Sequence, residues 1–102
     1  MTEPSSRDLH PATGARFAFD RVDSTLELGA APVYAVRVYL PEGRGWAATL
    51  AWDDGQATLA PVAEQPEPGP TAEEQAWVEA EALKLARVLH RDPRPHMLRW
   101  RG

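Results

Sequence analysis

The sequence predicts an α+β domain in which an antiparallel meander of four strands, or five, packs on one face against a single C-terminal helix. Apolar and polar side chains alternate in short stretches of residues 15–61, as is typical of strands with one buried face. Residues 71–91 instead show the periodicity of an amphipathic helix. Because the strands precede the helix, the order indicates a helix on one face of an antiparallel sheet and not a βαβ unit.

The composition is that of one soluble globular domain. The 102 residues are 43% hydrophobic and 25% charged, which suffices for one modest core. The chain has no cysteine, so disulfides and thiolate chemistry are excluded. Residues 1–14 are polar and predict a flexible leader, unlike a signal peptide. No stretch approaches the ~18 apolar residues of a membrane-spanning helix. We therefore expect a cytoplasmic protein that makes no membrane contact.

The first strand begins near Arg16 and places Phe17 and Phe19 on one face. Residues 25–28 alternate again after an interruption at residues 22–24, so this region is either one bulged strand or two short strands. The two alternatives account for the four or five strands of the predicted sheet.

Three further strands follow. Residues 33–40 are rich in β-branched and aromatic side chains and form the most strongly marked strand. A five-residue turn leads to a strand at residues 46–52, and an Asp-Gly pair then predicts a tight hairpin to residues 56–60. Pro61 ends this strand and indicates that it lies at an edge of the sheet.

The proline-rich segment 62–70 predicts a stiff, extended linker that carries the chain to the far side of the sheet. Thr71 and Glu74 then have the spacing of a capping box, and Pro93 prevents the helix from continuing beyond residues 71–91. The predicted buried stripe of this helix comprises Val78, Ala82, Leu85, Ala86 and Leu89. Residues 15–92 thus form one domain, and residues 93–102 follow it as a basic, aromatic tail.

Two carboxylates, Glu74 and Glu81, fall inside the apolar arc of the predicted helix. Glu is rarely buried without a partner, so we expect both at the rim, with Glu81 close to Lys84 three residues on. Packing, capping and dipole effects account for the other helix residues.

The sequence carries no signature of catalysis. Gly43 and Gly45 lie in a predicted hairpin turn and no helix follows them, unlike a phosphate-binding loop. None of the three serines lies in a nucleophile elbow, and the three histidines lack metal-site spacing. We therefore predict a protein that is not an enzyme and has no catalytic residue, cofactor or metal ligand.

The face of the sheet opposite the helix is the first candidate site. A solvated antiparallel face normally carries polar side chains, but this one is predicted to be small, flat and mildly apolar. Such a face can bind another protein or a second copy of the chain. The predicted contact residues are Ala35, Arg37, Tyr39, Ala47, Thr49 and Ala51. Two alternatives remain: the alanines are merely tolerated, or the tail folds over the face.

The tail suggests a second function, nucleic-acid binding. Basic and aromatic groups together grip single strands by charge and stacking. The residues of this alternative are Arg91, Arg94, Arg99, Trp100 and Arg101. Residues 84–102 carry a formal net charge of +5, whereas residues 1–83 carry a formal net charge of −9. Nucleic-acid binders usually carry a basic face on the fold itself, so a protein-interaction module is the favoured prediction and an enzyme is third.

Overall fold

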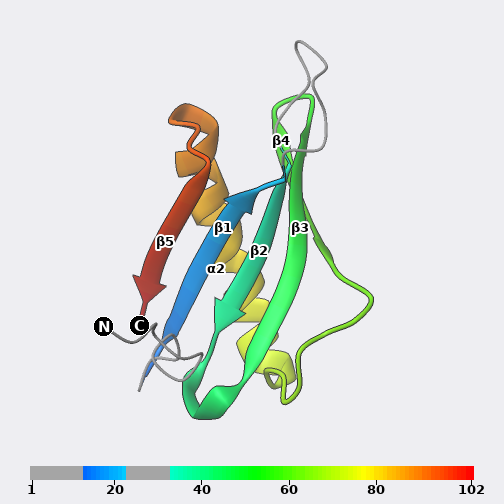
Figure 1. Cartoon of the computed structure of the whole chain (residues 1–102), viewed down its shortest axis with the longest axis vertical. Helices are drawn as coiled ribbons and strands as arrows, with labels where there is room; N and C mark the ends of the chain where they lie inside the picture. Colours follow the sequence, from blue (N-terminus) through cyan, green and yellow to red (C-terminus); the bar gives the residue numbers. More distant parts are fainter. Residues whose placement is uncertain (1–12, 23–32) are drawn as a thin grey trace, which may run out of the picture.

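A computed structural model describes residues 13–22 and 33–102 of the chain. These residues form one five-stranded antiparallel sheet in the order β4-β3-β2-β1-β5, with helix α2 lying across one face (Figure 1). The elements are β1 (Ala15–Arg21), β2 (Tyr34–Tyr39), the short 3-10 helix η1 (Pro41–Gly43), β3 (Gly45–Asp53), β4 (Gln56–Pro61), α2 (Ala72–Arg91) and β5 (His96–Arg101). The α+β prediction is confirmed, whereas the predictions for residues 1–12 and the strand at 25–28 lie outside the described residues.

Helix α2 begins as its capping box predicts. The Thr71 hydroxyl accepts a hydrogen bond from the backbone N–H of Glu74 at 3.2 Å, and the Glu74 carboxylate accepts one from the Thr71 N–H at 2.9 Å. These contacts satisfy backbone donors that have no partner within the first helical turn. At the other end, Asp92 caps the helix one residue before Pro93, where proline forbids further helical hydrogen bonding.

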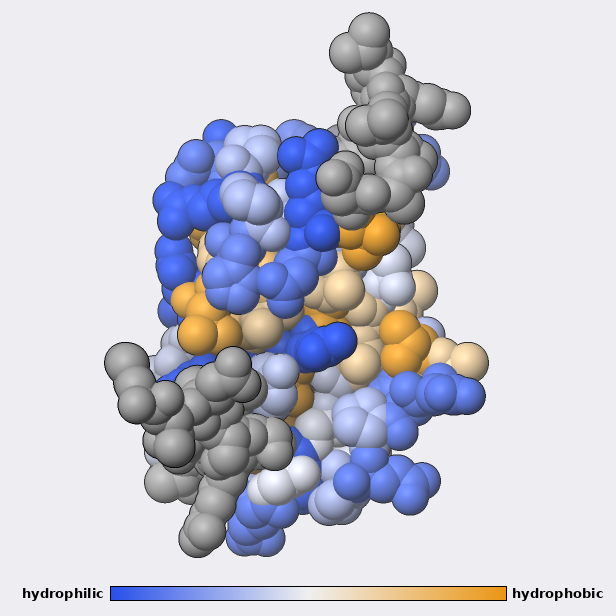
Figure 2. Space-filling model, viewed as in Figure 1, coloured by the Kyte–Doolittle hydropathy of each residue, from blue (hydrophilic) through white to orange (hydrophobic). Residues whose placement is uncertain are grey.

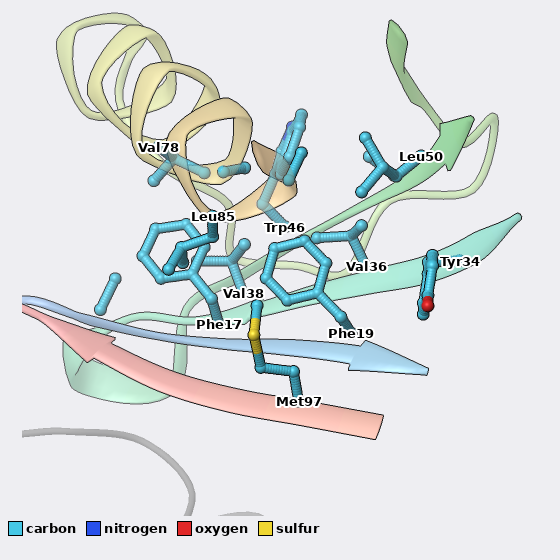
Figure 3. Packing of buried hydrophobic residues seen from close by; sticks show 14 of the residues in the cluster. Phe17, Phe19, Tyr34, Val36, Val38, Trp46, Leu50, Val78, Leu85 and Met97 are labelled. Atoms are coloured by element: carbon cyan, nitrogen blue, oxygen red, sulfur yellow. The ribbon is translucent and has the colours of Figure 1, made fainter. Parts of the chain in front are cut away.

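The core lies between α2 and the sheet face that it covers, which we call the inner face. Strand alternation sends every second side chain to this face, and Figure 3 shows how those of Phe17, Phe19 and Val38 point toward Leu85 of the helix. The Trp77 ring meets Phe17 edge-on, with 6.2 Å between the ring centroids. The buried cluster comprises Ala15, Phe17, Phe19, Tyr34, Val36, Val38, Leu40, Trp46, Ala48, Leu50, Val78, Ala82, Leu85, Ala86, Leu89 and Met97.

The tail supplies the fifth strand. Residues His96–Arg101 pair with β1 along its free edge, and Met97, opposite Phe19, is buried in the core. The hydroxyl of Tyr34 donates a hydrogen bond of 2.7 Å to the carbonyl of Arg94 and so ties the preceding turn to β2. Because this strand extends the sheet at its edge, the tail does not lie over the face opposite α2 (Figure 1).

The proline-rich linker contacts the sheet through the Gln65 side chain and through its backbone. Where β4 ends, the Gln65 amide bonds both the N–H (3.0 Å) and the carbonyl (2.6 Å) of Ala47, and it also donates to the carbonyl of Val62 at 2.9 Å. The Gln65 side chain thus pairs with the β3 backbone as a residue of a neighbouring strand would. A backbone bond from Gly45 to Pro68, 2.9 Å, holds the linker further along the same edge.

Candidate functional site

The sheet face opposite α2, which we call the outer face, carries the predicted contact residues. Strand register sets its membership, because residues paired across neighbouring strands point to the same side. Three rows of paired residues run across four or all five strands in this way, and Ala51 pairs with Thr58 beyond them. Within the strands, the outer face comprises Arg16, Ala18, Asp20, Ala35, Arg37, Tyr39, Ala47, Thr49, Ala51, Thr58, Ala60, His96, Leu98 and Trp100.

The structure brings all six predicted contact residues together on β2 and β3. Ala35 lies opposite Thr49 and Arg37 lies opposite Ala47, while Tyr39 and Ala51 continue the same face toward the two ends of the sheet. Arg37 and Thr49 are exposed, and the other four are half-buried. No element among residues 13–22 and 33–102 lies over them.

Three exposed apolar side chains that were not among the predicted contacts enlarge this surface. Leu98 and Trp100 of β5 are 40% and 52% exposed, and Val22, which follows β1, is 41% exposed. The Trp100 indole donates a hydrogen bond to the carbonyl of Thr13 at 3.0 Å, which fixes the ring at the sheet edge. Figure 2 shows hydrophobic atoms in a band across this face, interrupted by hydrophilic ones. The apolar alternation of Leu98 and Trp100 was the only sequence signal for this extension.

The ionisable side chains of the outer face include Asp20, His96 and Arg37. The Asp20 carboxylate and the His96 imidazole are hydrogen-bonded across the β1–β5 pair, with 2.6 Å between Oδ1 and Nδ1. Arg37, one strand away, makes no ion pair with any residue of the described segments. Within the described segments, the guanidinium therefore lies among alanines with no ion-pair partner for its five N–H donors.

One end of the outer face is hollowed. A depression of about 490 Å³ lies where the Gln65 contact meets β2 and β3, and its walls include Arg37, Tyr39, Ala47 and Pro66. Sequence reasoning treated residues 62–70 as a spacer and missed this wall. A single glutamine among prolines was the one local sign that the linker makes a specific contact.

The five basic and aromatic residues of the tail do not form one surface. Arg99 and Arg101 point to the inner side of β5, whereas Trp100 between them points to the outer side. Arg91 lies at the end of α2, and Arg94 is paired with Asp92 at 2.5 Å in the following turn. A strand of six residues spans about 20 Å, so the two ends of the tail are widely separated.

The helix carboxylates are both accounted for by local partners. Glu74 accepts a hydrogen bond from the Arg44 guanidinium, which comes from the β2–β3 connection. That bond, followed by the one from the Thr71 N–H, lowers the pKa of Glu74 to about 2; the same contact raises the pKa of Arg44. Glu81 lies at the rim, 3.5 Å from Lys84, as expected.

Neither a metal site nor a membrane-spanning helix is found among the described residues. Residues 13–22 and 33–102 contain no group of three His, Asp or Glu side chains that could hold a metal ion, and α2 lacks the apolar length needed to cross a bilayer. The outer face can provide flat apolar contact and the Arg37 guanidinium, which has no ion-pair partner within residues 13–22 and 33–102. These properties suit binding to a flat surface.

Comparison with known proteins adds nothing to this geometry: no family model, no curated protein and no solved structure matches the chain.

Proposed function

We propose that this chain is a non-catalytic protein-interaction module that binds through its outer sheet face, and that the partner on this face is a second copy of the chain. The observation that supports the proposal is an antiparallel face, five strands wide, that neither α2 nor β5 covers. Alanine, leucine and tryptophan stand there in positions that are normally polar on a solvated face.

The arrangement of charges favours a two-fold dimer. Arg37 of β2 and Asp20 of β1 lie diagonally across adjacent rows of the outer face. Consider a two-fold axis in the plane of the interface that passes through the midpoint of the line joining them and is perpendicular to that line. It brings Arg37 of each copy opposite Asp20 of the other copy. Such an isologous contact is self-complementary by construction. The remaining outer-face side chains of β2 and β3 are small or flat, which suits close approach of two sheets.

The area of the face indicates a weak association. Strands about 4.8 Å apart and about 20 Å long give roughly 400–500 Å² for the five strands of one copy. A standard stable interface buries about 800 Å² per partner. We therefore expect a dissociation constant in the micromolar range or weaker, so that monomer and dimer exchange rapidly.

Sedimentation velocity over a range of protein concentrations tests this proposal. Ala35→Glu places an unpaired charge in the centre of the dimer contact. It should weaken the association at least thirtyfold, equivalent to ~2 kcal/mol. Ala76→Glu, an exposed substitution on α2, is the matched control and should leave the mass distribution unchanged. A protein that stays monomeric at millimolar concentration would contradict the proposal, as would equal effects of the two substitutions.

The fold of each variant must be measured alongside its mass. Far-UV circular dichroism should show that Ala35→Glu unfolds at nearly the same temperature as the Ala76→Glu control, because residue 35 is only half-buried. An unfolded Ala35→Glu variant would mean that the face is covered internally, and this result would also overturn the proposed dimer.

A further inference from the structure

A groove of about 640 Å³ lies on the opposite side of the molecule from the outer face, between the last turns of α2 and the β3–β4 hairpin. Pockets that hold small ligands usually measure about 300–1,000 Å³. The groove is lined by Trp52, Leu83, Arg87, His90 and Arg91, together with residues of the β3–β4 hairpin. Apart from Arg91, none of these residues belongs to either site predicted from the sequence.

One wall of the groove is largely apolar. The Trp52 ring is held edge-on by Tyr34, with 5.7 Å between the ring centroids, and it lies 5.9 Å from the His90 ring at an angle of 34°. Leu83 stands across from β4 with 37% of its surface exposed, although it is a large apolar residue at a position next to the core. A ligand with a flat apolar body would cover both side chains.

The other wall is cationic. Arg87 and Arg91 are four residues apart, so they share one face of α2, and both are exposed. Neither makes an ion pair with the described part of the chain, although Asp53 and Asp54 occupy the adjoining hairpin. Guanidinium groups bind carboxylate and phosphate oxygens through paired hydrogen bonds. Two such groups beside an apolar wall would recognise an anion attached to a flat body.

We propose that this groove binds a small aromatic anion, with the Arg87 and Arg91 guanidinium groups on its phosphate or carboxylate and with Trp52 and Leu83 on its ring. The proposal is independent of the dimer, because the groove is on the helix side of the sheet. A purely structural role is the competing explanation for these arginines, since cations near a helix C-terminus stabilise the helix dipole.

Titration of the full chain with phenyl phosphate, followed by amide and indole chemical shifts in NMR, tests the site. We expect saturable shifts of the Trp52 indole and of the last two turns of α2. Benzoate, tested separately, shows whether a carboxylate is accepted as well as a phosphate. Inorganic phosphate and phenol each supply half of the recognised chemistry, and both should bind at least about tenfold more weakly.

Two variants separate binding from helix stability. Arg87→Gln combined with Arg91→Gln should raise the dissociation constant of phenyl phosphate at least about tenfold, whereas the control Arg94→Gln, in the turn beyond the groove, should not change it. Leu83→Glu adds a carboxylate to the apolar wall at an exposed position and should also abolish binding. If the double variant lowers the unfolding temperature but binds phenyl phosphate normally, or if phenol binds as well as phenyl phosphate, the proposal is wrong.

Discussion

Glu74 joins the start of α2 to the connection between β2 and β3, and its replacement tests how this junction contributes to stability. The carboxylate accepts hydrogen bonds from the Thr71 N–H and from Arg44, whose Nε in turn donates to the carbonyl of Pro41 at 3.1 Å. Glu74→Gln removes the charge but leaves an amide that can complete a capping box. Glu74→Ala removes both interactions, so the two variants separate the ion pair from the cap.

The partial exposure of this pair limits the expected effect. The side chains of Arg44 and Glu74 are 21% and 32% exposed, so water screens their attraction and the ion pair should contribute ~0.5–1 kcal/mol. Loss of a helix cap typically removes about a further 1 kcal/mol. We therefore expect Glu74→Gln to lower the free energy of unfolding by ~0.5–1 kcal/mol and Glu74→Ala by ~1.5–2 kcal/mol at neutral pH.

The dependence on pH follows from the lowered pKa of Glu74. Its carboxyl has a pKa of about 2 in the folded protein, against an ordinary value of 4.5. A lowered folded-state pKa means that the stabilisation is fully present above pH 4.5 and is lost as the pH falls from 4.5 toward 2. The stability difference between the native protein and Glu74→Gln should therefore shrink over this range.

Urea unfolding followed by far-UV circular dichroism at several pH values measures both quantities. Glu73→Gln is the matched control, because Glu73 lies in the same helical turn and is exposed but has no bond to Arg44. If Glu74→Gln and Glu73→Gln have equal effects, only the helix dipole is involved. That result, or a difference that persists unchanged at pH 2–3, would refute the role assigned to the ion pair.

Two further substitutions test contacts that position the linker and the last strand. Gln65→Ala should lower the free energy of unfolding by about 1–3 kcal/mol, because its amide satisfies both backbone groups of Ala47; unchanged denaturation midpoints would contradict this. Tyr34→Phe should lower it by ~0.5–1.5 kcal/mol and speed hydrogen exchange in β5, since the lost hydroxyl bonds the carbonyl of Arg94. If exchange rates in β5 match those of the native protein, the hydrogen bond from Tyr34 to Arg94 does not stabilise β5.

Local patterns predicted the elements well because each element is specified by neighbouring residues. Thr71, Glu74 and Pro93 mark the ends of a helix that spans Ala72–Arg91 in the structure. Pro61 ends β4, an edge strand as predicted, because proline cannot donate to a sheet ladder. The grouping of the six predicted contact residues on one face followed from strand alternation and the location of the helix stripe.

Contacts between distant segments could not be predicted in this way. Alternation of Leu98 with Trp100 indicates a strand, but no local signal indicates that its partner is β1. The bond between Arg44 and Glu74 links residues 30 positions apart, and the groove beside Trp52 depends on how α2 crosses the β3–β4 hairpin. These features depend on tertiary packing. The local pattern of one sequence does not show which distant residues come into contact.

The pairing of β1 with β5 constrains the order in which the sheet can be completed. Asp20 and His96 face each other across 76 positions of sequence, and closing so long a loop is entropically unfavourable and slow. On the ribosome, where about 5–20 residues are added per second, β1 emerges several seconds before its second neighbour has been made. During that interval one edge of β1 has no strand to pair with, and nascent chains on one messenger could pair there with each other.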